Sequence, residues 1–202
     1  KTCAGAVYVL AVPASETAET NSSDLPRSEL WLFGVTIFLG AFLLFQVQPV
    51  IGKYILPWFG GTPGVWTTCL LFFQCLLLGG YAYAHWLSQR QPRQQVQIHL
   101  TLLCIVGVIL SGVFLSMLGG LSPIEWLKPD PSTAAGRPVL GILTLLLVGI
   151  GLPYLVLSST GPLIQAWFAR KYDGRSPYRL YALSNVGSLL ALITYPFLVE
   201  PY

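Results

Sequence analysis

Charged residues are scarce in this sequence of 202 residues. Lys and Arg together number 11 and Asp and Glu number 8, so charged residues make up only 9% of the chain, where soluble domains carry about a quarter. The mean hydropathy is +0.66, and a soluble globule of that composition would expose large apolar patches, which soluble monomers avoid. The composition therefore excludes a soluble enzyme, a disordered tail and a nucleic-acid-binding protein that depends on a dense basic patch.

Signatures of catalysis and of metal binding are lacking as well. The sequence has no Walker loop, dinucleotide fingerprint, G-x-S-x-G motif or zinc signature. Its two histidines have no ligand spacing with a Cys, Asp or Glu, and its four cysteines form no CxxC pair. Nearly all carboxylates fall in expected tails or loops. We therefore expect no catalytic residue, no cofactor, no metal ion, and no enzyme activity from this chain alone.

Long apolar runs are the main feature that is present. A bilayer core needs about 20 apolar residues in a helix, and in lipid each backbone polar group must be paired within its own segment. The runs do not alternate as the strands of a β-barrel do. The sequence therefore predicts an all-α fold, a polytopic transmembrane helical bundle of about five spans. The spans are expected at about residues 30–56, 65–87, 98–118, 139–158 and 178–199.

A further short helix is expected between the fourth and fifth spans. Thr160 and Gly161 can cap it, Pro162 suits its first turn, and Arg170 and Lys171 suit its C-terminal end. The apolar residues that fall on one face are Leu163, Ile164, Trp167 and Phe168. This pattern predicts a helix lying in the cytoplasmic interface of the membrane; a cytosolic loop with a chance apolar run is the alternative.

Basic residues in the loops predict the orientation. Seven of them fall on one side of the expected spans: Arg27, Arg90, Arg93, Arg170, Lys171, Arg175 and Arg179. The other side carries Lys53, Lys128 and Arg137. We therefore expect a multi-pass protein of the cell (inner) membrane with a cytoplasmic N-terminus.

The two ends of the chain suggest a processed or truncated product. Residues 1–29 are expected to be a disordered lead. The apolar run at 4–12, with Val12-Pro13-Ala14 before Ser15, fits the remnant of a secretory signal. A non-native start is the alternative. The membrane domain is expected at 30–202 and, because it stops just after an apolar run, we expect it to be truncated at its C-terminus.

Polar side chains within the spans mark either helix contacts or a functional path. Gln46 and Lys53 share one face of span one with Pro49 between them, and Lys53 lies about 35 Å along the axis, where its amine can reach water. The residues that form a candidate polar site inside the membrane are Gln46, Lys53, Gln74, Tyr81, His85 and Asn185. Pairing between helices and anchoring at the interface are the alternative roles.

Several neighbouring residues are assigned simpler roles. His85 and His99 are interpreted as interface residues, and Tyr83 is expected to point away from the face that carries Gln74, Tyr81 and His85. On span five, small residues predict the closest helix–helix contact of the domain. These helix-packing residues are Ser184, Gly187, Ser188 and Ala191.

Two stretches are similar to a known family. They run from Leu44-Phe45-Gln46-Val47-Gln48-Pro49 to Gly60-Gly61-Thr62-Pro63-Gly64-Val65-Trp66, and from Tyr178-Arg179-Leu180-Tyr181-Ala182-Leu183-Ser184-Asn185-Val186-Gly187-Ser188 to Tyr195-Pro196-Phe197-Leu198-Val199-Glu200-Pro201. They resemble the N-terminal membrane region of bacterial fused membrane/spermidine synthase-like proteins, over roughly residues 30–202. In that family a multi-span, major-facilitator-like domain precedes a cytosolic domain related to aminopropyltransferases.

The resemblance implies an integral membrane domain that anchors the larger protein or handles its substrate. It also implies further spans and a soluble domain of the same full-length protein as partners. The composition implies the lipid bilayer as a partner and no nucleic acid. The family's enzyme-like domain has no counterpart in these residues. The alternatives are a purely structural membrane subunit and part of a secondary transporter for a small polar or cationic metabolite. The transporter hypothesis rests on Pro49 and Pro153, since interrupted helices often line binding sites. If it is right, Gln46, Gln74 and Asn185 should face one cavity.

Overall fold

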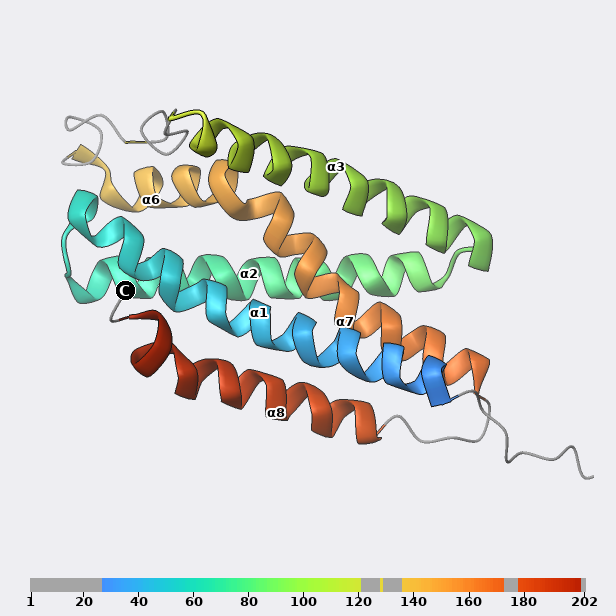
Figure 1. Cartoon of the computed structure of the whole chain (residues 1–202). Helices are drawn as coiled ribbons and strands as arrows, with labels where there is room; N and C mark the ends of the chain where they lie inside the picture. The colour runs from blue at the N-terminus through green and yellow to red at the C-terminus, as the bar shows by residue number, and fades with distance from the viewer. Residues whose placement is uncertain (1–26, 121–127, 129–135, 173–177, 201–202) are drawn as a thin grey trace, which may run out of the picture.

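Five long helices make up the fold (Figure 1), which confirms the all-α prediction of a polytopic helical bundle. The computed structural model describes residues 27–120, 128, 136–172 and 178–200. The helices are α1 (Arg27–Phe59), α2 (Pro63–Ser88), α3 (Pro92–Leu118), α6 (Pro138–Leu146) joined through the π-helix η1 (Leu147–Gly151) to α7 (Leu152–Lys171), and α8 (Tyr178–Thr194) followed by the π-helix η2 (Tyr195–Val199). Within those residues, five helical segments are long and apolar enough to cross a membrane.

Prolines and a glycine mark several of the helix ends. Proline occupies the first turn of α2, α3 and α6, where its missing N–H costs no helical hydrogen bond. Gly60 ends α1 with a φ of +81°, a left-handed conformation that favours glycine, and its N–H donates to the Leu56 carbonyl. α1 already begins at Arg27, so the expected lead of 1–29 is wrong for its last three residues. The lead's remainder, residues 1–26, and its candidate signal remnant lie outside the described residues.

The fourth span is longer than predicted. α6, η1 and α7 form one helical segment from Pro138 to Lys171, so the separate interfacial helix expected after residue 158 was wrong. Pro162 lies inside α7 without ending it. The apolar face expected to rest on the membrane surface packs inside the protein: Leu163 lies with Ala84 and Leu87 of α2. This contact with α2 cannot be read from the local sequence. It favours a helix that continues the fourth span over a separate helix at the membrane surface.

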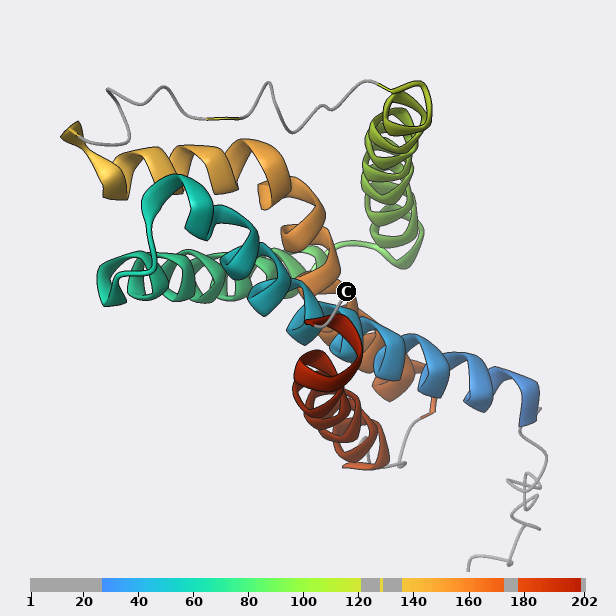
Figure 2. The same ribbon diagram turned by 60° about the vertical axis from the view of Figure 1, so that its left-hand side comes forward.

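The helices pack as two parallel pairs. The most extensive contacts are between α1 and α8 and between α2 and α7, and Figures 1 and 2 show these partners side by side. Successive spans alternate in direction, so the partners in each pair run the same way. The main core lies where α1, α2, α6 and α7 meet, around Ile55, Phe73, Ile142 and Tyr154.

The alternating directions bring most basic residues to one end of the bundle, which we call the basic end. This end holds the start of α1, the end of α2, the start of α3, the end of α7 and the start of α8 (Figure 1). Glu29 of α1 pairs there with Lys171 and accepts a hydrogen bond from the Tyr172 hydroxyl at 2.7 Å. That hydrogen bond raises the pKa of Tyr172. Arg175 lies outside the described residues.

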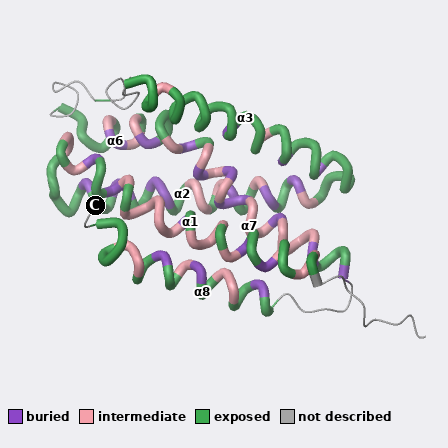
Figure 3. Tube along the Cα trace, viewed as in Figure 1, coloured by how far each residue is buried: buried purple, intermediate pink, exposed green. Residues whose placement is uncertain are grey.

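α3 stands apart from the other helices (Figure 2). Its buried side chains are only Gln95, His99 and Val106, and the rest of its length is largely exposed (Figure 3). Its exposed residues are mostly large and apolar, as a lipid-facing helix requires and a water-facing helix does not. The apolar composition, the five span-length helices of the described residues and the exposed apolar side chains together indicate a multi-pass membrane protein.

Glycines set the closest approaches between the paired helices. A Cβ added at Gly187 of α8 would lie 2.7 Å from the carbonyl oxygen of Phe38 in α1. A Cβ added at Gly80 of α2 would lie 3.1 Å from the backbone nitrogen of Ser159 in α7. Of the other expected helix-packing residues, Ala191 is fully buried, whereas Ser184 and Ser188 are half-buried and joined by a hydrogen bond from the Ser188 hydroxyl to the Ser184 carbonyl.

Candidate functional site

A group of polar residues lies around Pro49, where α1 meets α8 and η2. We call it the Pro49 centre, and it comprises Gln46, Pro49, Thr194 and Tyr195. The Tyr195 hydroxyl donates to the Pro49 carbonyl at 3.3 Å, and on the opposite side of α1 Gln48 Nε2 lies 2.7 Å from the Tyr154 hydroxyl. These hydrogen bonds tie three separate segments of chain together inside the bundle.

Gln46 has an oxygen without a partner. Its Nε2 lies 3.3 Å from Thr194 Oγ1, and that hydroxyl donates to the Leu190 carbonyl at 2.7 Å. Because the hydroxyl proton is already used, Thr194 can only accept from Gln46, which fixes the orientation of the amide. Gln46 Oε1 is then buried with no hydrogen-bond donor. Such an acceptor is costly unless a ligand or water satisfies it.

One helical hydrogen bond is missing near this oxygen, within the continuous helix α1. Pro49 has no N–H, so the Phe45 carbonyl lacks its usual helical donor. The π-helix η2, which contains Pro196, follows Thr194 directly, and π-turns are frequent at functional sites. The Pro49 centre is therefore rich in acceptors and contains no charged side chain.

Lys53 lies two turns beyond Gln46 and one turn beyond Pro49, at the end of the bundle opposite the basic end. Its amine donates to the Glu200 carbonyl at 3.0 Å and lies 3.7 Å from a Glu200 carboxylate oxygen. Both side chains are about half exposed. Lys53 thus ties the end of η2 to α1 and is partnered within its own chain.

The remaining residues of the predicted polar site do not join Gln46. Gln74, Tyr81 and His85 are exposed along one face of α2, and Asn185 is exposed on α8. His85 contacts Gln89 through Nε2 at 3.0 Å. Within the described part of the chain, Gln74 and Asn185 form no side-chain hydrogen bond, and neither contacts the Pro49 centre.

A second polar group, which we call the His99 cluster, joins α3 to α7 near the basic end. It comprises Gln95, His99, Thr160 and Trp167, with Tyr83 of α2 beside them. Gln95 is completely buried; its Oε1 accepts from Trp167 Nε1 at 2.8 Å, and its Nε2 donates to the Ser88 carbonyl at 3.2 Å. Arg170 donates to the same carbonyl at 3.1 Å.

His99 is buried, so its interpretation as an interface residue was wrong. Its side chain is only 4% exposed, between the rings of Tyr83 and Trp167. Its Nε2 lies 3.5 Å from the Thr160 hydroxyl, which itself donates to the Val156 carbonyl. His99 Nδ1 and the Tyr83 hydroxyl are buried without a hydrogen-bond partner among the described residues.

Sequence reasoning missed the His99 cluster, although a signal was present. Gln95 and His99 are four residues apart at the start of an apolar span, a spacing that puts two polar side chains on one helix face. The expected start of span three near residue 98 placed Gln95 in a loop. Because α3 begins at Pro92, both residues instead face α7.

The described residues offer little to a metal ion. No group of three or more His, Cys, Asp or Glu side chains comes together within them. Of the described cysteines, Cys69 is buried, whereas Cys75 and Cys104 are exposed on apolar helices and form no disulfide. What the Pro49 centre can do chemically is accept hydrogen bonds from a donor-rich ligand.

Comparison with known protein families, with curated proteins and with solved structures found no match to this chain.

Proposed function

We propose that this chain is the membrane domain of a spermidine synthase-like fused protein and that it handles a small cationic metabolite at the Pro49 centre. The observation that carries the proposal is the unpartnered, buried Oε1 of Gln46. A buried acceptor needs a donor, and an ammonium group supplies up to three.

The surroundings of Gln46 favour an amine over an anion. The Tyr195 hydroxyl and the Phe45 carbonyl, which lacks its helical donor at Pro49, supply oxygen atoms, and the charge of Lys53 is paired with Glu200. Interrupted helices that present carbonyls to a cation are a recurrent arrangement in membrane transporters. The resemblance to fused spermidine synthase-like proteins supports the same ligand class, because those proteins are associated with polyamines.

Binding of 1,4-diaminobutane to the full chain in nanodiscs tests this proposal, with uncharged 1,4-butanediol as the control ligand. Calorimetry should show saturable binding of the diamine and none of the diol. Gln46→Leu should weaken binding by at least tenfold, because a hydrogen bond to a charged group contributes about 1.5–3 kcal/mol. Gln46→Glu should strengthen it, because a carboxylate adds a full charge opposite the ammonium.

Gln74→Leu is the matched control, since Gln74 is an exposed glutamine within a span. It should bind the diamine as the unmodified chain does. Absence of saturable binding to the unmodified chain, or equal binding by Gln46→Leu and Gln74→Leu, would contradict the proposal and leave anchoring as the role of the domain.

A further inference from the structure

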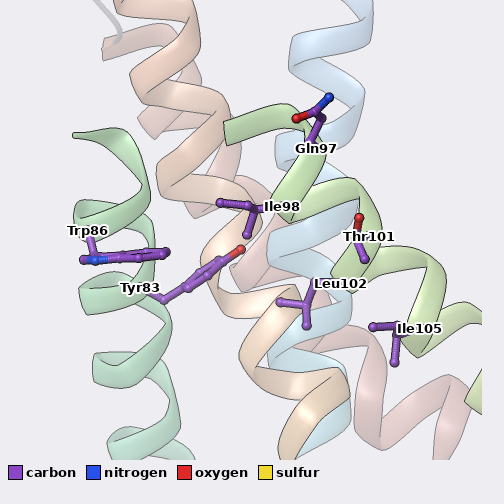
Figure 4. A pocket seen from close by; sticks show the side chains of 7 residues that line it. All are labelled: Tyr83, Trp86, Gln97, Ile98, Thr101, Leu102 and Ile105. Atoms are coloured by element: carbon purple, nitrogen blue, oxygen red, sulfur yellow. The ribbon is translucent and has the colours of Figure 1, made fainter. Parts of the chain in front are cut away.

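A groove runs between α2 and α3 near the basic end. Its volume is about 450 Å³, a size typical of ligand pockets. Tyr83 and Trp86 form one wall from α2, and Ile98, Leu102 and Ile105 form the other from α3 (Figure 4). The groove exists because α3 contacts the bundle mainly through Gln95 and His99 and otherwise stands apart (Figure 2).

The polarity of the groove changes along its length. Trp86 and Gln97 lie at the end nearer the start of α3, which belongs to the basic end, whereas Leu102 and Ile105 lie farther along α3 (Figure 4). From Ile98 to Ile105 the wall is about 10 Å long. A ligand that fits both parts has a polar head at the basic end and an apolar tail directed toward the middle of the membrane.

Two arginines, Arg90 and Arg93, lie near the polar end of the groove. The Arg90 guanidinium lies over the ring of Trp86, 4.7 Å from its centroid, and it has no carboxylate partner among the described residues. Arg93 is exposed on the first turn of α3. Glu29, the acidic residue described at this end, is already paired with Lys171. This charge is complementary to an anionic headgroup.

We propose that the groove is a binding site for an anionic phospholipid. The phosphate lies beside Arg90, and one acyl chain lies along Ile98, Leu102 and Ile105. The Tyr83 hydroxyl, buried in the α2 wall without a partner, is the group that a lipid ester oxygen satisfies after a small shift of the ring. The bound lipid fills the gap that separates α3 from α2.

Native mass spectrometry of the full chain, delipidated and then exposed to equal amounts of phosphatidylglycerol and phosphatidylcholine, tests the site. The unmodified chain should retain phosphatidylglycerol at least fivefold more than phosphatidylcholine. Leu102→Trp, which fills the groove, should reduce retained lipid at least fivefold. Leu103→Trp, at an exposed position beside it, should retain lipid normally.

Arg90→Gln separates recognition of the headgroup from folding, because Arg90 is an exposed side chain. This variant should retain the two lipids about equally, whereas Arg137→Gln, at an exposed arginine before α6, should keep the preference. Equal retention of both lipids by the unmodified chain would overturn the proposal. Retention of as much phosphatidylglycerol by Leu102→Trp as by the unmodified chain would also overturn the proposal. So would a mass spectrum in which the chain is a dimer without bound lipid, because a second copy would then cover the groove.

Discussion

Gly187→Ala should destabilise the protein, although alanine is the better helix former. The added Cβ would lie 2.7 Å from the Phe38 carbonyl oxygen and 3.5 Å from the Ala41 Cβ. A backbone oxygen cannot move aside as a flexible side chain can, so α1 and α8 must separate. Overpacking of this kind costs about 1–3 kcal/mol, more than the gain of about 1 kcal/mol in helix propensity. Thermal unfolding in detergent should show a lower midpoint.

Gly40→Ala is the matched control for this effect. Gly40 lies on α1 between Phe38 and Ala41, the two residues that Gly187 approaches. A Cβ added at Gly40 meets no atom within 4 Å. This variant should unfold at the same temperature or slightly higher, because only the propensity term remains. If both variants changed the thermal unfolding midpoint in the same direction and by the same amount, the close contact between α1 and α8 at Gly187 would be contradicted.

Gln95→Leu should release α3 from the bundle. Leucine has a similar volume, but it removes the acceptor of the Trp167 indole N–H and the donor to the Ser88 carbonyl. A buried donor left without a partner costs about 1–3 kcal/mol. Since α3 has few other buried side chains, the expected result is a broader distance distribution between spin labels on α3 and α7, together with lower thermal stability.

Gln94→Leu separates this effect from a simple change in polarity. Gln94 is the neighbouring glutamine, exposed and without a side-chain hydrogen bond among the described residues. Its variant should keep the narrow distance distribution of the unmodified chain. A narrow distribution in Gln95→Leu as well would show that α3 is held by something other than the His99 cluster.

The sequence was sufficient for the helices because lipid leaves the backbone few options. Apolar runs of about 20 residues must be helical there, and proline and glycine marked several helix ends, as at Pro63 and Gly60. The break expected after residue 158 failed for a physical reason. Pro162 and Gly161 are local signals for a new helix, but burial of Leu163 against α2 outweighs them.

The polar sites were harder to predict, because hydrogen bonds between helices depend on which spans become neighbours. Gln46 was singled out, but its partner Thr194 is 148 residues away, and no local spacing connects them. His99 was placed at the interface because a lone histidine at a span's start is common there. Its burial depends on how α7 crosses α3 and on the contact with Trp167.

Cysteine labelling in sealed vesicles tests the membrane topology most directly. In a variant without native cysteines, single cysteines replace Gly61 between α1 and α2, Gln91 between α2 and α3, and Leu78 within α2. A membrane-impermeant maleimide should reach Gly61→Cys and Gln91→Cys from opposite sides and Leu78→Cys from neither, although Leu78 is 70% exposed in the isolated chain. Rapid labelling of Leu78→Cys, or labelling of both loops from one side, would contradict a chain that crosses the bilayer five times.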